Sequence, residues 1–522
     1  MVHYSTNDWR APRRFVMLHL VRISPVNQTQ TDYDLLVIGG GINGAGIAAD
    51  AAGRGLKVAL VEKGDLASAT SSWSSKLIHG GLRYLEQYQF ALVRKSLQER
   101  EILTAAARHI IKPLAFQIPI LGNSRNGLLL RVGLFVYDYL VQRGHYKRSR
   151  SLSYGVSSPL NSSIRSGFEY WDAQVDDSRL VLINALQAQE HGADILTRTE
   201  VVDVYSDGYG WHVMVRDHIE NTDQKLRCKV LVNAAGPWVS QLHAKLMGDE
   251  ASYKLRLVKG SHIVLPKLHD QDNAFLLQHH DGRVIFVIPY LGKYSLVGTT
   301  EEEYEGDLDK PTISDAERDY LIAIVNLYFK NSVSRSDVVG SYSGIRPLIE
   351  SEGTAATKVS RDYKLHLDKK PSPQLSVYGG KVTTYRVLAE QVMNQLGPFF
   401  PRTRGSWTKR ATLPGGDFEL SENLFQDLAS QYSWLRPDII RRWQCSYGTL
   451  AFKILKNTRS MGDMGVCFGA NLYQREVDYL CEHEWAHTAE DILWRRTKLG
   501  YQFSDREIES LSNYLSQSRD AA

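Results

Sequence analysis

The segment 34–62 has the pattern of a dinucleotide-binding βαβ unit and constrains the fold more than any other part of the chain. An apolar run leads into Gly39, Gly41 and Gly44, which have GxGxxG spacing. In this motif the first glycine makes a tight turn, the second lets the backbone approach a pyrophosphate, and the third lets the helix pack on the strand. A second apolar run ends at Glu62, whose carboxylate can bind ribose hydroxyls. The segment therefore predicts a bound adenine dinucleotide, and Glu62 disfavours a 2′-phosphate.

Length and composition limit the number of domains and the class of protein to which this unit can belong. With 522 residues, 43% of them hydrophobic and 23% charged, the chain is typical of a soluble globular protein with two or three domains. The net charge of +4 does not demand nucleic-acid binding, and we expect no nucleic-acid partner. The cysteines have no CxxC or metal-ligand spacing, which favours a reducing compartment and no structural metal. They are Cys228, Cys445, Cys467 and Cys481.

No apolar stretch approaches the ~20 residues that span a bilayer, so we expect the chain to be soluble or to lie on a membrane surface. The strongest apolar segment outside the βαβ unit is 128–141, LLLRVGLFVYDYLV, which also carries Arg131 and Asp138. We expect a core helix here, with an interfacial helix as the alternative. The basic cluster 143–150 can face acidic lipid or form a solvated loop.

The first 31 residues form a basic extension ahead of the first predicted strand. It lacks an apolar core region and a small-residue cleavage site, so it is not interpreted as a secretory signal. A mitochondrial presequence, an upstream start codon and a disordered arm all remain open. We expect 1–31 to lie outside the fold and to have no stable structure.

A second motif, ATSSWSSKLIHGGLRYLE at 69–86, concentrates hydroxyl groups suited to a polar ligand. Gly80 and Gly81 would let the backbone pass close to a flat group, and Arg83 and Tyr84 add a guanidinium and a phenol. Taken alone, the motif is better explained as an exposed loop that enters an amphipathic helix. Its bulky Trp73 has no explanation from sequence.

Several further motifs follow in a fixed order. They are GLFVYDYL, GFEYWDAQVDDSRLV at 167–181, NAAGPWV at 233–239, VKGSHIVLP at 258–266, FVIPY before VGTTEEEYEGD, SGIRPL at 343–348 and GGKVTTYR at 379–386. With these motifs, the chain resembles the FAD-dependent glycerol-3-phosphate dehydrogenases, most closely the aerobic bacterial kind, from about 33 to about 500. The resemblance resolves the cofactor to FAD.

The resemblance implies an α/β fold: a Rossmann-like FAD-binding domain of the glutathione-reductase/D-amino-acid-oxidase type, an antiparallel β-rich substrate domain and a C-terminal α-helical domain. The oxidoreductase region covers 32–400, and its FAD domain is discontinuous. We expect the FAD domain at 32–108, 170–248 and 340–395, the substrate domain mainly at 249–339, and the helical domain at 401–522. The pattern predicts β-rich segments at 256–265, 274–289 and 294–299, and amphipathic helices at 420–428, 434–443, 475–483 and 505–517.

The resemblance also implies a set of cofactor-binding residues. They are Gly39, Gly41, Gly44, Glu62, Ser75, Lys76, Gly80, Gly81, Val202, Ala235, Gly236, Gly344, Arg346, Gly380, Lys381, Val382 and Thr383. The glycine pair at 379–380 opens a helix, where free N–H groups would stabilise negative charge on a reduced flavin. An ordinary helix start is the alternative there, and plain sheet core is the alternative for Val202.

A phosphate monoester needs several cations or donors, among which arginine is preferred because its fork matches phosphate oxygens. By resemblance the substrate-binding candidates are Arg83, Tyr84, Arg346, Arg361 and Lys381. Arg346 is also expected to act in catalysis. The expected general base is His262, although a lone histidine on a strand is usually structural. His79 is its rival.

The implied reaction is oxidation of sn-glycerol 3-phosphate to dihydroxyacetone phosphate by hydride transfer to FAD, with electrons passed to a membrane quinone, ubiquinone or menaquinone. The implied enzyme is a homodimer bound peripherally at the cytoplasmic face of the inner membrane. One alternative is a soluble oxidase that uses O2 and produces H2O2. Another is a flavoprotein with structural FAD whose C-terminal helices bind a partner.

Overall fold

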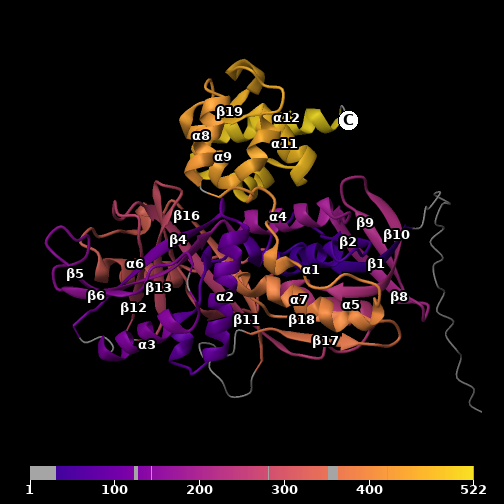
Figure 1. Cartoon of the computed structure of the whole chain (residues 1–522), viewed down its shortest axis with the longest axis horizontal. Helices are drawn as coiled ribbons and strands as arrows, with labels where there is room; N and C mark the ends of the chain where they lie inside the picture. Colours follow the sequence, from indigo (N-terminus) through magenta and orange to yellow (C-terminus); the bar gives the residue numbers. More distant parts are fainter. Residues whose placement is uncertain are drawn as a thin grey trace, which may run out of the picture.

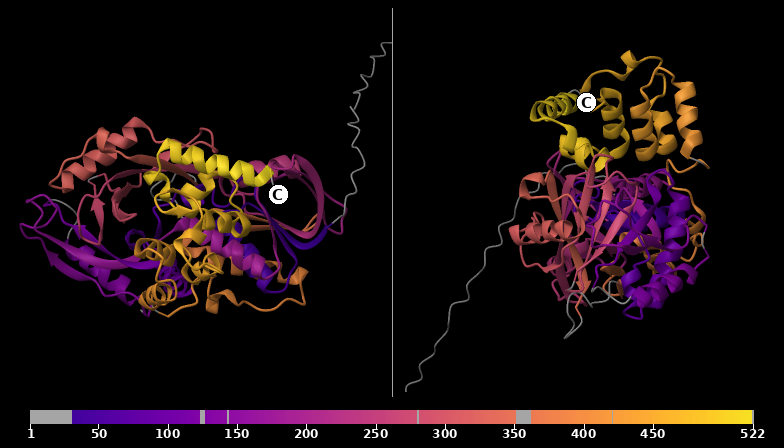
Figure 2. Two further views of the ribbon diagram at one scale, coloured as in Figure 1. Left: turned by 90° about the horizontal axis from the view of Figure 1, so that it is seen from above. Right: turned by 90° about the vertical axis from the view of Figure 1, so that its left-hand side faces the viewer.

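The computed structural model describes residues 31–122, 127–142, 144–279, 281–350, 362–419 and 421–520. Two sheets and their covering helices form the body of the molecule, and the C-terminal helices form a separate layer above them (Figure 1). Seen from above, this layer lies over the body with α12 across its top (Figure 2). The predicted extension 1–31 lies outside the described residues except for Thr31, where the first strand begins.

The first sheet contains the predicted βαβ unit. Its strands are ordered β17-β18-β10-β1-β2-β7, and all neighbours are parallel except β17 and β18. Their bounds are β1 Thr31–Ile38, β2 Val58–Val61, β7 Asp194–Leu196, β10 Thr222–Asn233, β17 Lys364–Asp368 and β18 Gln374–Tyr378. An antiparallel hairpin, β8 Thr199–Ser206 and β9 Trp211–Asp217, continues from β10. The central strands are apolar along their length because both faces of the sheet are covered.

Three helices pack together on one face of this sheet. They are α1 Ile42–Gly53, α4 Asp177–Glu190 and α7 Tyr385–Leu396. The small residues of α1 permit this close packing, since a side chain at Gly46 would collide with the ring of Tyr385. The hairpin and α5 Val239–Met247 cover the opposite face.

The second sheet has the order β15-β11-β14-β13-β12-β4-β6-β3, with β16 on β11 and β5 on β6. Its strands are β3 Leu77–Ile78, β4 Ile111–Pro119, β5 Arg150–Ser153, β6 Ser166–Val175, β11 Leu255–Pro266, β12 Ala274–Gln278, β13 Val284–Tyr290, β14 Tyr294–Gly298, β15 Glu302–Glu303 and β16 Gly340–Ile349. Pairing is antiparallel except between β12 and β4. Helix α6, Asp315–Tyr328, packs on one face, and α2, Phe90–Ala106, with α3, Gly127–Tyr139, packs on the other.

Three parts of the expected FAD domain differ from the structure. Strand β3 and helix α2, in the expected segment 32–108, belong to the second sheet and the helices that cover it. Strand β16, expected in the FAD domain, pairs with β11 from Leu255 opposite Ile349 to Val264 opposite Gly340. Strand β6, which the expected boundary at residue 170 divides, lies wholly in the second sheet. Strand pairing between distant segments decides sheet membership, and the local motifs on which the boundaries were based carry no information about that pairing.

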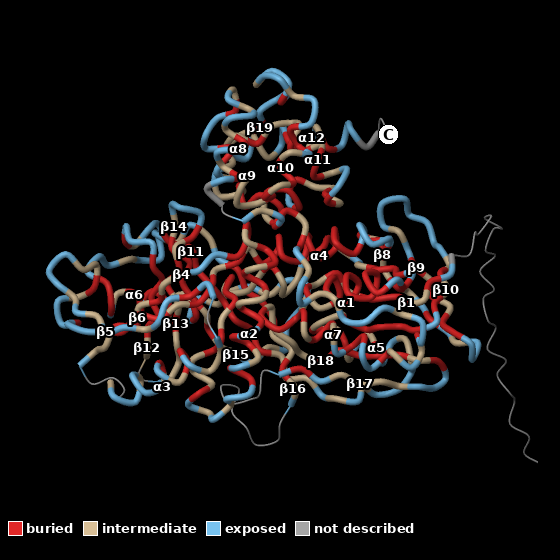
Figure 3. The backbone as a smooth tube through the Cα atoms, in the orientation of Figure 1, coloured by how far each residue is buried: buried red, intermediate tan, exposed pale blue. Residues whose placement is uncertain are grey.

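The C-terminal domain has a hydrophobic core of its own, seen as buried segments within the upper layer (Figure 3). It comprises α8 Ser421–Gln431, α9 Pro437–Ser446, α10 Ala451–Ile454, β19 Cys467–Gly469, β20 Leu472–Tyr473, α11 Gln474–Glu484, a π-helical segment Asp491–Arg496 and α12 Asp505–Asp520. The four amphipathic helices expected from the sequence correspond to α8, α9, α11 and α12. Together the two sheets and this domain confirm the expected fold class.

Helix α3 is not the core helix that we expected. Leu128, Val132, Phe135 and Tyr139 recur along one face of α3 and are exposed, with Leu128 at 68% and Phe135 at 61%. Only the opposite face, which includes Leu134, is buried. Composition could not distinguish the two cases, because both predict an apolar helix. No helix of the described chain is both long and apolar enough to cross a bilayer.

Candidate active site

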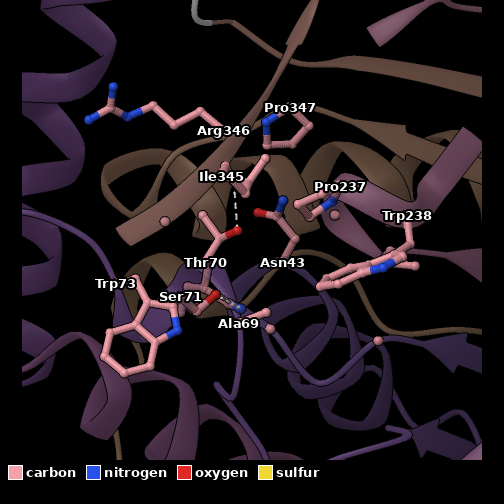
Figure 4. A pocket seen from close by; sticks show the side chains of 18 of the residues that line it. Asn43, Ala69, Thr70, Ser71, Trp73, Pro237, Trp238, Ile345, Arg346 and Pro347 are labelled. Carbon is pink, nitrogen blue, oxygen red and sulfur yellow. Dashed lines mark hydrogen bonds between the residues drawn. The ribbon is translucent and has the colours of Figure 1, made fainter. Parts of the chain in front are cut away.

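A cavity of about 530 Å³ lies between the two sheets and is lined by residues from widely separated motifs. One wall is formed by the ends of β1 and β2 and the segment after β10, and the other includes β16. The serine-rich loop 68–75 joins these walls, because the hydroxyl of Thr70 donates to the carbonyl of Ile345 at 2.7 Å (Figure 4). The cavity thus opens at the carboxyl ends of parallel strands, where α/β sheets bind their ligands.

The glycines at the start of α1 leave no room for side chains. A Cβ at Gly44 would lie 1.8 Å from the carbonyl oxygen of Gly39. Gly39 has a φ of +110°, and a Cβ there would meet the carbonyl of Ala234 at 2.6 Å. Gly39 and Gly41 line the cavity itself. The turn is therefore shaped for a ligand that contacts backbone, as a pyrophosphate does at a helix N-terminus.

Glu62 lies beside this turn with its carboxylate held in place. It accepts hydrogen bonds from the amides of Gly40 at 2.6 Å and Gly64 at 2.7 Å. Burial raises the pKa of Glu62, and the two amide donors oppose that rise. The carbonyl oxygen of the Asn43 side chain is buried here without a hydrogen-bond partner among the described residues. A ligand with hydroxyl or amide donors would satisfy these acceptors.

Cationic and phenolic side chains also line the cavity. Arg346, Lys381 and Tyr84 all line it, and the Lys381 ammonium lies 4.3 Å from the centre of the Tyr84 ring. The Arg346 guanidinium donates to the hydroxyl of Thr299 at 2.8 Å. It also forms an ion pair with Glu301, with 3.8 Å between Nη1 and Oε1. Side chains of this kind are suited to a small anion such as a phosphate ester.

His262 lies behind the wall and does not line the cavity. Its ring is 1% exposed, stacks on Tyr342 with 4.9 Å between ring centres, and shares a hydrogen bond of 2.9 Å between Nε2 and Ser75 Oγ. Burial, with Arg346 and Lys76 nearby, lowers its pKa well below the usual range. His262 is therefore uncharged at neutral pH.

Comparison with known proteins agrees with this geometry. The family model for FAD dependent oxidoreductases matches residues 34–365, and the model for the C-terminal domain of alpha-glycerophosphate oxidase matches residues 406–516. A glycerol-3-phosphate dehydrogenase from Pseudomonas aeruginosa is 48% identical over 489 residues, which cover 92% of this chain and 95% of the relative. The chain belongs to the FAD-dependent glycerol-3-phosphate dehydrogenase family.

Two further members show how broad the family is. D-erythritol 1-phosphate dehydrogenase from Brucella abortus is 46% identical, covering 89% of this chain and 94% of the relative. The solved structure of glycerol-3-phosphate dehydrogenase from Bacillus halodurans, in complex with FAD, is 26% identical, covers 94% of this chain and 95% of its own, and has a TM-score of 0.71. The expected cofactor, FAD, is confirmed for this chain.

Many of the residues expected at the site of this FAD-dependent enzyme do line the cavity. They are Gly39, Gly41, Glu62, Ser75, Tyr84, Ala235, Gly236, Gly344, Arg346, Gly380, Lys381, Val382 and Thr383. His79, the rival base, also lines it. Gly44 does not line the cavity, but its lack of a side chain lets α1 pack against the turn at Gly39. Arg361 lies outside the described residues.

Other expected residues face elsewhere. The Lys76 ammonium is buried against Asp177 at 2.9 Å and the carbonyl of Ser72 at 2.9 Å, so it does not reach a cofactor in the cavity. Gly80 approaches protein rather than a flat ligand, since a Cβ there would lie 2.5 Å from Leu97 and Tyr137. These partners come from distant helices, which local sequence could not reveal.

The remaining three residues are also absent from the cavity wall. Gly81, at a φ of +77°, precedes the short helix Leu82–Leu85. Arg83 lies within that helix, and the helix brings only Tyr84 to the wall. Val202 sits at an irregularity in the pairing of β8 with β9, which leaves Val201 to line the cavity in its place.

Sequence reasoning missed two features of the wall. Trp73, unexplained by the motif, lines the cavity and packs on Tyr342 with 5.3 Å between ring centres. Its carbonyl would collide with any side chain at Gly344. Thr299, which holds Arg346, lies in the VGTT motif, but nothing in that motif marks its hydroxyl as the partner of an arginine.

Proposed function

We propose that this chain oxidises sn-glycerol 3-phosphate to dihydroxyacetone phosphate with FAD as the hydride acceptor. The observation that carries the proposal is that Arg346, Lys381 and Tyr84 line the same cavity as the glycine turn and Glu62, which suit a dinucleotide. A phosphate ester of two negative charges fits two cations and a phenolic donor. The names of the most similar relatives point to the same class of substrate.

The residues divide the work between cofactor and substrate. The glycine turn and Glu62 would hold the pyrophosphate and ribose, and 379–383 would lie against the flavin. When bound, FAD supplies the hydride acceptor, and the protein supplies position and a proton acceptor. Arg346 would bind the substrate phosphate or alcohol oxygen, held in orientation by Thr299. Trp73 and the walls of the two sheets exclude water from the reacting atoms.

The electron acceptor in this proposal is a membrane quinone, reached from a peripheral position on the cytoplasmic face of the inner membrane. Support comes from α3, whose apolar stripe is unusual on a protein surface. Arg131, Lys147 and Arg148 are exposed beside it, and the Arg148 guanidinium lies 4.9 Å from the centre of the Tyr139 ring. An apolar face bordered by cations is typical of a helix in the interface of an acidic bilayer. A homodimer stays a prediction.

Vesicle binding tests the membrane proposal. Replacing Phe135 by Glu should weaken binding to phosphatidylglycerol vesicles about tenfold or more, because the variant has no aromatic side chain at this position to bury in the bilayer. Tyr209→Glu is the matched control, since Tyr209 is 87% exposed at the turn of the β8–β9 hairpin, away from α3. Equal losses in both variants, or none in Phe135→Glu, would contradict docking through α3.

Reduction of the bound flavin tests the substrate. Under anaerobic conditions sn-glycerol 3-phosphate should bleach the visible absorbance, whereas glycerol and an amino acid should not. D-erythritol 1-phosphate is tested separately, because one relative at 46% identity is named D-erythritol 1-phosphate dehydrogenase. Faster bleaching by the erythritol ester would reassign the substrate within the same chemistry.

Reoxidation of the reduced flavin separates the quinone enzyme from an oxidase. A soluble quinone analogue should reoxidise it much faster than dissolved oxygen does. The reverse order, with peroxide formed in proportion, would favour the oxidase. No bleaching by any phosphate ester would instead favour a flavoprotein with structural FAD.

A further inference from the structure

The buried position of His262 raises the question of how it could take a proton from a substrate in the cavity. Its ring is fully covered, and Ser75, which lines the cavity, is hydrogen-bonded to it. Ser75 is half-buried, lines the cavity, and has Oγ 2.9 Å from His262 Nε2. A hydroxyl in this position can accept one proton and donate another.

We propose that Ser75 is a catalytic residue that relays the proton of the substrate alcohol to His262. The relay rests on the proposed function, because it needs an alcohol in the cavity. It also gives Ser75 a role different from the cofactor contact expected from the sequence.

The relay balances as follows. The O–H bond of the substrate C2 alcohol breaks while a new O–H bond forms on Ser75 Oγ. The original Ser75 O–H bond breaks as an N–H bond forms on His262 Nε2. The hydrogen on C2 leaves with its electron pair for the flavin, and the C2–O bond becomes a carbonyl. The substrate thus loses one proton and one hydride, so that it is oxidised and FAD is reduced.

The neighbours of Ser75 on both sides are anchored to the same carboxylate. Ser74 donates its hydroxyl to Asp177 at 2.7 Å, and the Lys76 ammonium binds Asp177 at 2.9 Å. Asp177 is the first residue of α4, and the Tyr342 hydroxyl adds a bond to the carbonyl of Ser74 at 2.8 Å. The backbone on either side of Ser75 is therefore fixed. This fixes the direction of its hydroxyl, as a relay requires.

The histidine side is equally constrained. The ring lies between Tyr342 and Gly298, where any side chain at Gly298 would collide with it. Its Nδ1 has no hydrogen-bond partner among the described residues, so within that part of the chain the Ser75 hydroxyl is the hydrogen-bonding group that adds to this packing in orienting the imidazole. The cations nearest to it, Arg346 on β16 and Lys76 on the serine-rich loop, favour the uncharged ring. The uncharged ring leaves Nε2 a lone pair that can receive the proton, and its low pKa means that it holds that proton only briefly.

Three variants of the full-length holoenzyme test the relay. Ser75→Ala should slow anaerobic flavin reduction by sn-glycerol 3-phosphate about 10²–10⁴-fold, the usual share of general base catalysis. Ser75→Thr, which keeps a hydroxyl, should recover much of that loss. Ser72→Ala is the matched control, because Ser72 is a buried serine of the same loop that does not line the cavity. It should reduce flavin at nearly the wild-type rate.

A proton inventory on the wild type needs no variant. Two protons move together in the relay, so the rate of flavin reduction should fall along a curve as the deuterium content of the solvent rises. Histidine-selective nitrogen NMR adds a readout independent of turnover. The His262 Nε2 signal should move in Ser75→Ala and stay in place in Ser72→Ala.

The outcomes separate two failures. If the wild type bleaches with the substrate and Ser75→Ala bleaches equally fast, or the inventory is linear, the relay is wrong and the proposed function survives. If the flavin of the wild type does not bleach at all, the proposed function is wrong, and the relay, which depends on it, is wrong as well.

Discussion

The cavity and the interface beneath the C-terminal domain both contain many charges, yet the two regions use them differently. In the interface, Arg496 is fully buried and binds Asp65 with 2.7 Å between Nη2 and Oδ1, and Arg179 binds Glu484 at 3.0 Å. In the cavity, Arg346 is partly exposed, and Glu301 is too distant for a hydrogen bond. The same type of side chain therefore holds domains together in one region and lines a ligand-sized cavity in the other.

Breaking an interface pair should produce the largest effect on stability. Arg496→Met removes two hydrogen bonds to the buried Asp65 carboxylate, which keeps Arg495 as its partner, so we expect a loss of about 2–3 kcal/mol. We expect a strongly lowered melting temperature of the holoenzyme. Arg436→Met, which breaks an exposed pair with Asp438 in the same domain, is the control and should change little. Similar melting of both variants would show that burial does not distinguish these charges.

Arg346→Ala should have the opposite profile. We expect flavin reduction to fall about 10²–10³-fold and the KM for the phosphate ester to rise, because a donor to the substrate is lost. The melting temperature should stay near that of the wild type, since the side chain is 24% exposed. The control is Arg318→Ala on α6, which removes a similarly half-buried arginine that does not line the cavity. Unchanged flavin reduction in Arg346→Ala would refute the proposed site.

Acid should destabilise both regions through one buried histidine in each. His109, packed against Gly415 and Gly448 beneath the C-terminal domain, has its pKa lowered to about 3 by burial and by Arg179. His262 also has a lowered pKa. Below about pH 6.5 these histidines bind protons in the unfolded chain but stay uncharged in the folded chain. The free energy of unfolding therefore falls as pH falls, by about 1.4 kcal/mol per pH unit for each histidine.

Replacing His109 by Gln should remove about half of this acid slope and leave flavin reduction unchanged. Melting temperatures at several pH values would measure it. Flavin reduction itself should show no loss from His262 between pH 8 and 6.5, because that ring stays neutral across the range. A loss of rate centred near pH 6.5 would mean that His262 titrates normally.

The sequence predicted best what is local. The turn at Gly39, the acid at Glu62 and the glycine pair before Lys381 lie where expected. Each of these motifs has a backbone conformation that its own consecutive residues determine. The prediction from sequence failed where residues far away in the chain determine the position of a side chain or a strand. Lys76 belongs to the cofactor motif by position, but Asp177, a hundred residues away, takes its ammonium. The sheet of β16 and the exposure of α3 were undetermined for the same reason.

Anaerobic mixing of the holoenzyme with one equivalent of sn-glycerol 3-phosphate tests the central claim most directly. The flavin should bleach completely in a single turnover, with one dihydroxyacetone phosphate formed for each flavin reduced. Persistent yellow colour, or bleaching without that product, would contradict the account.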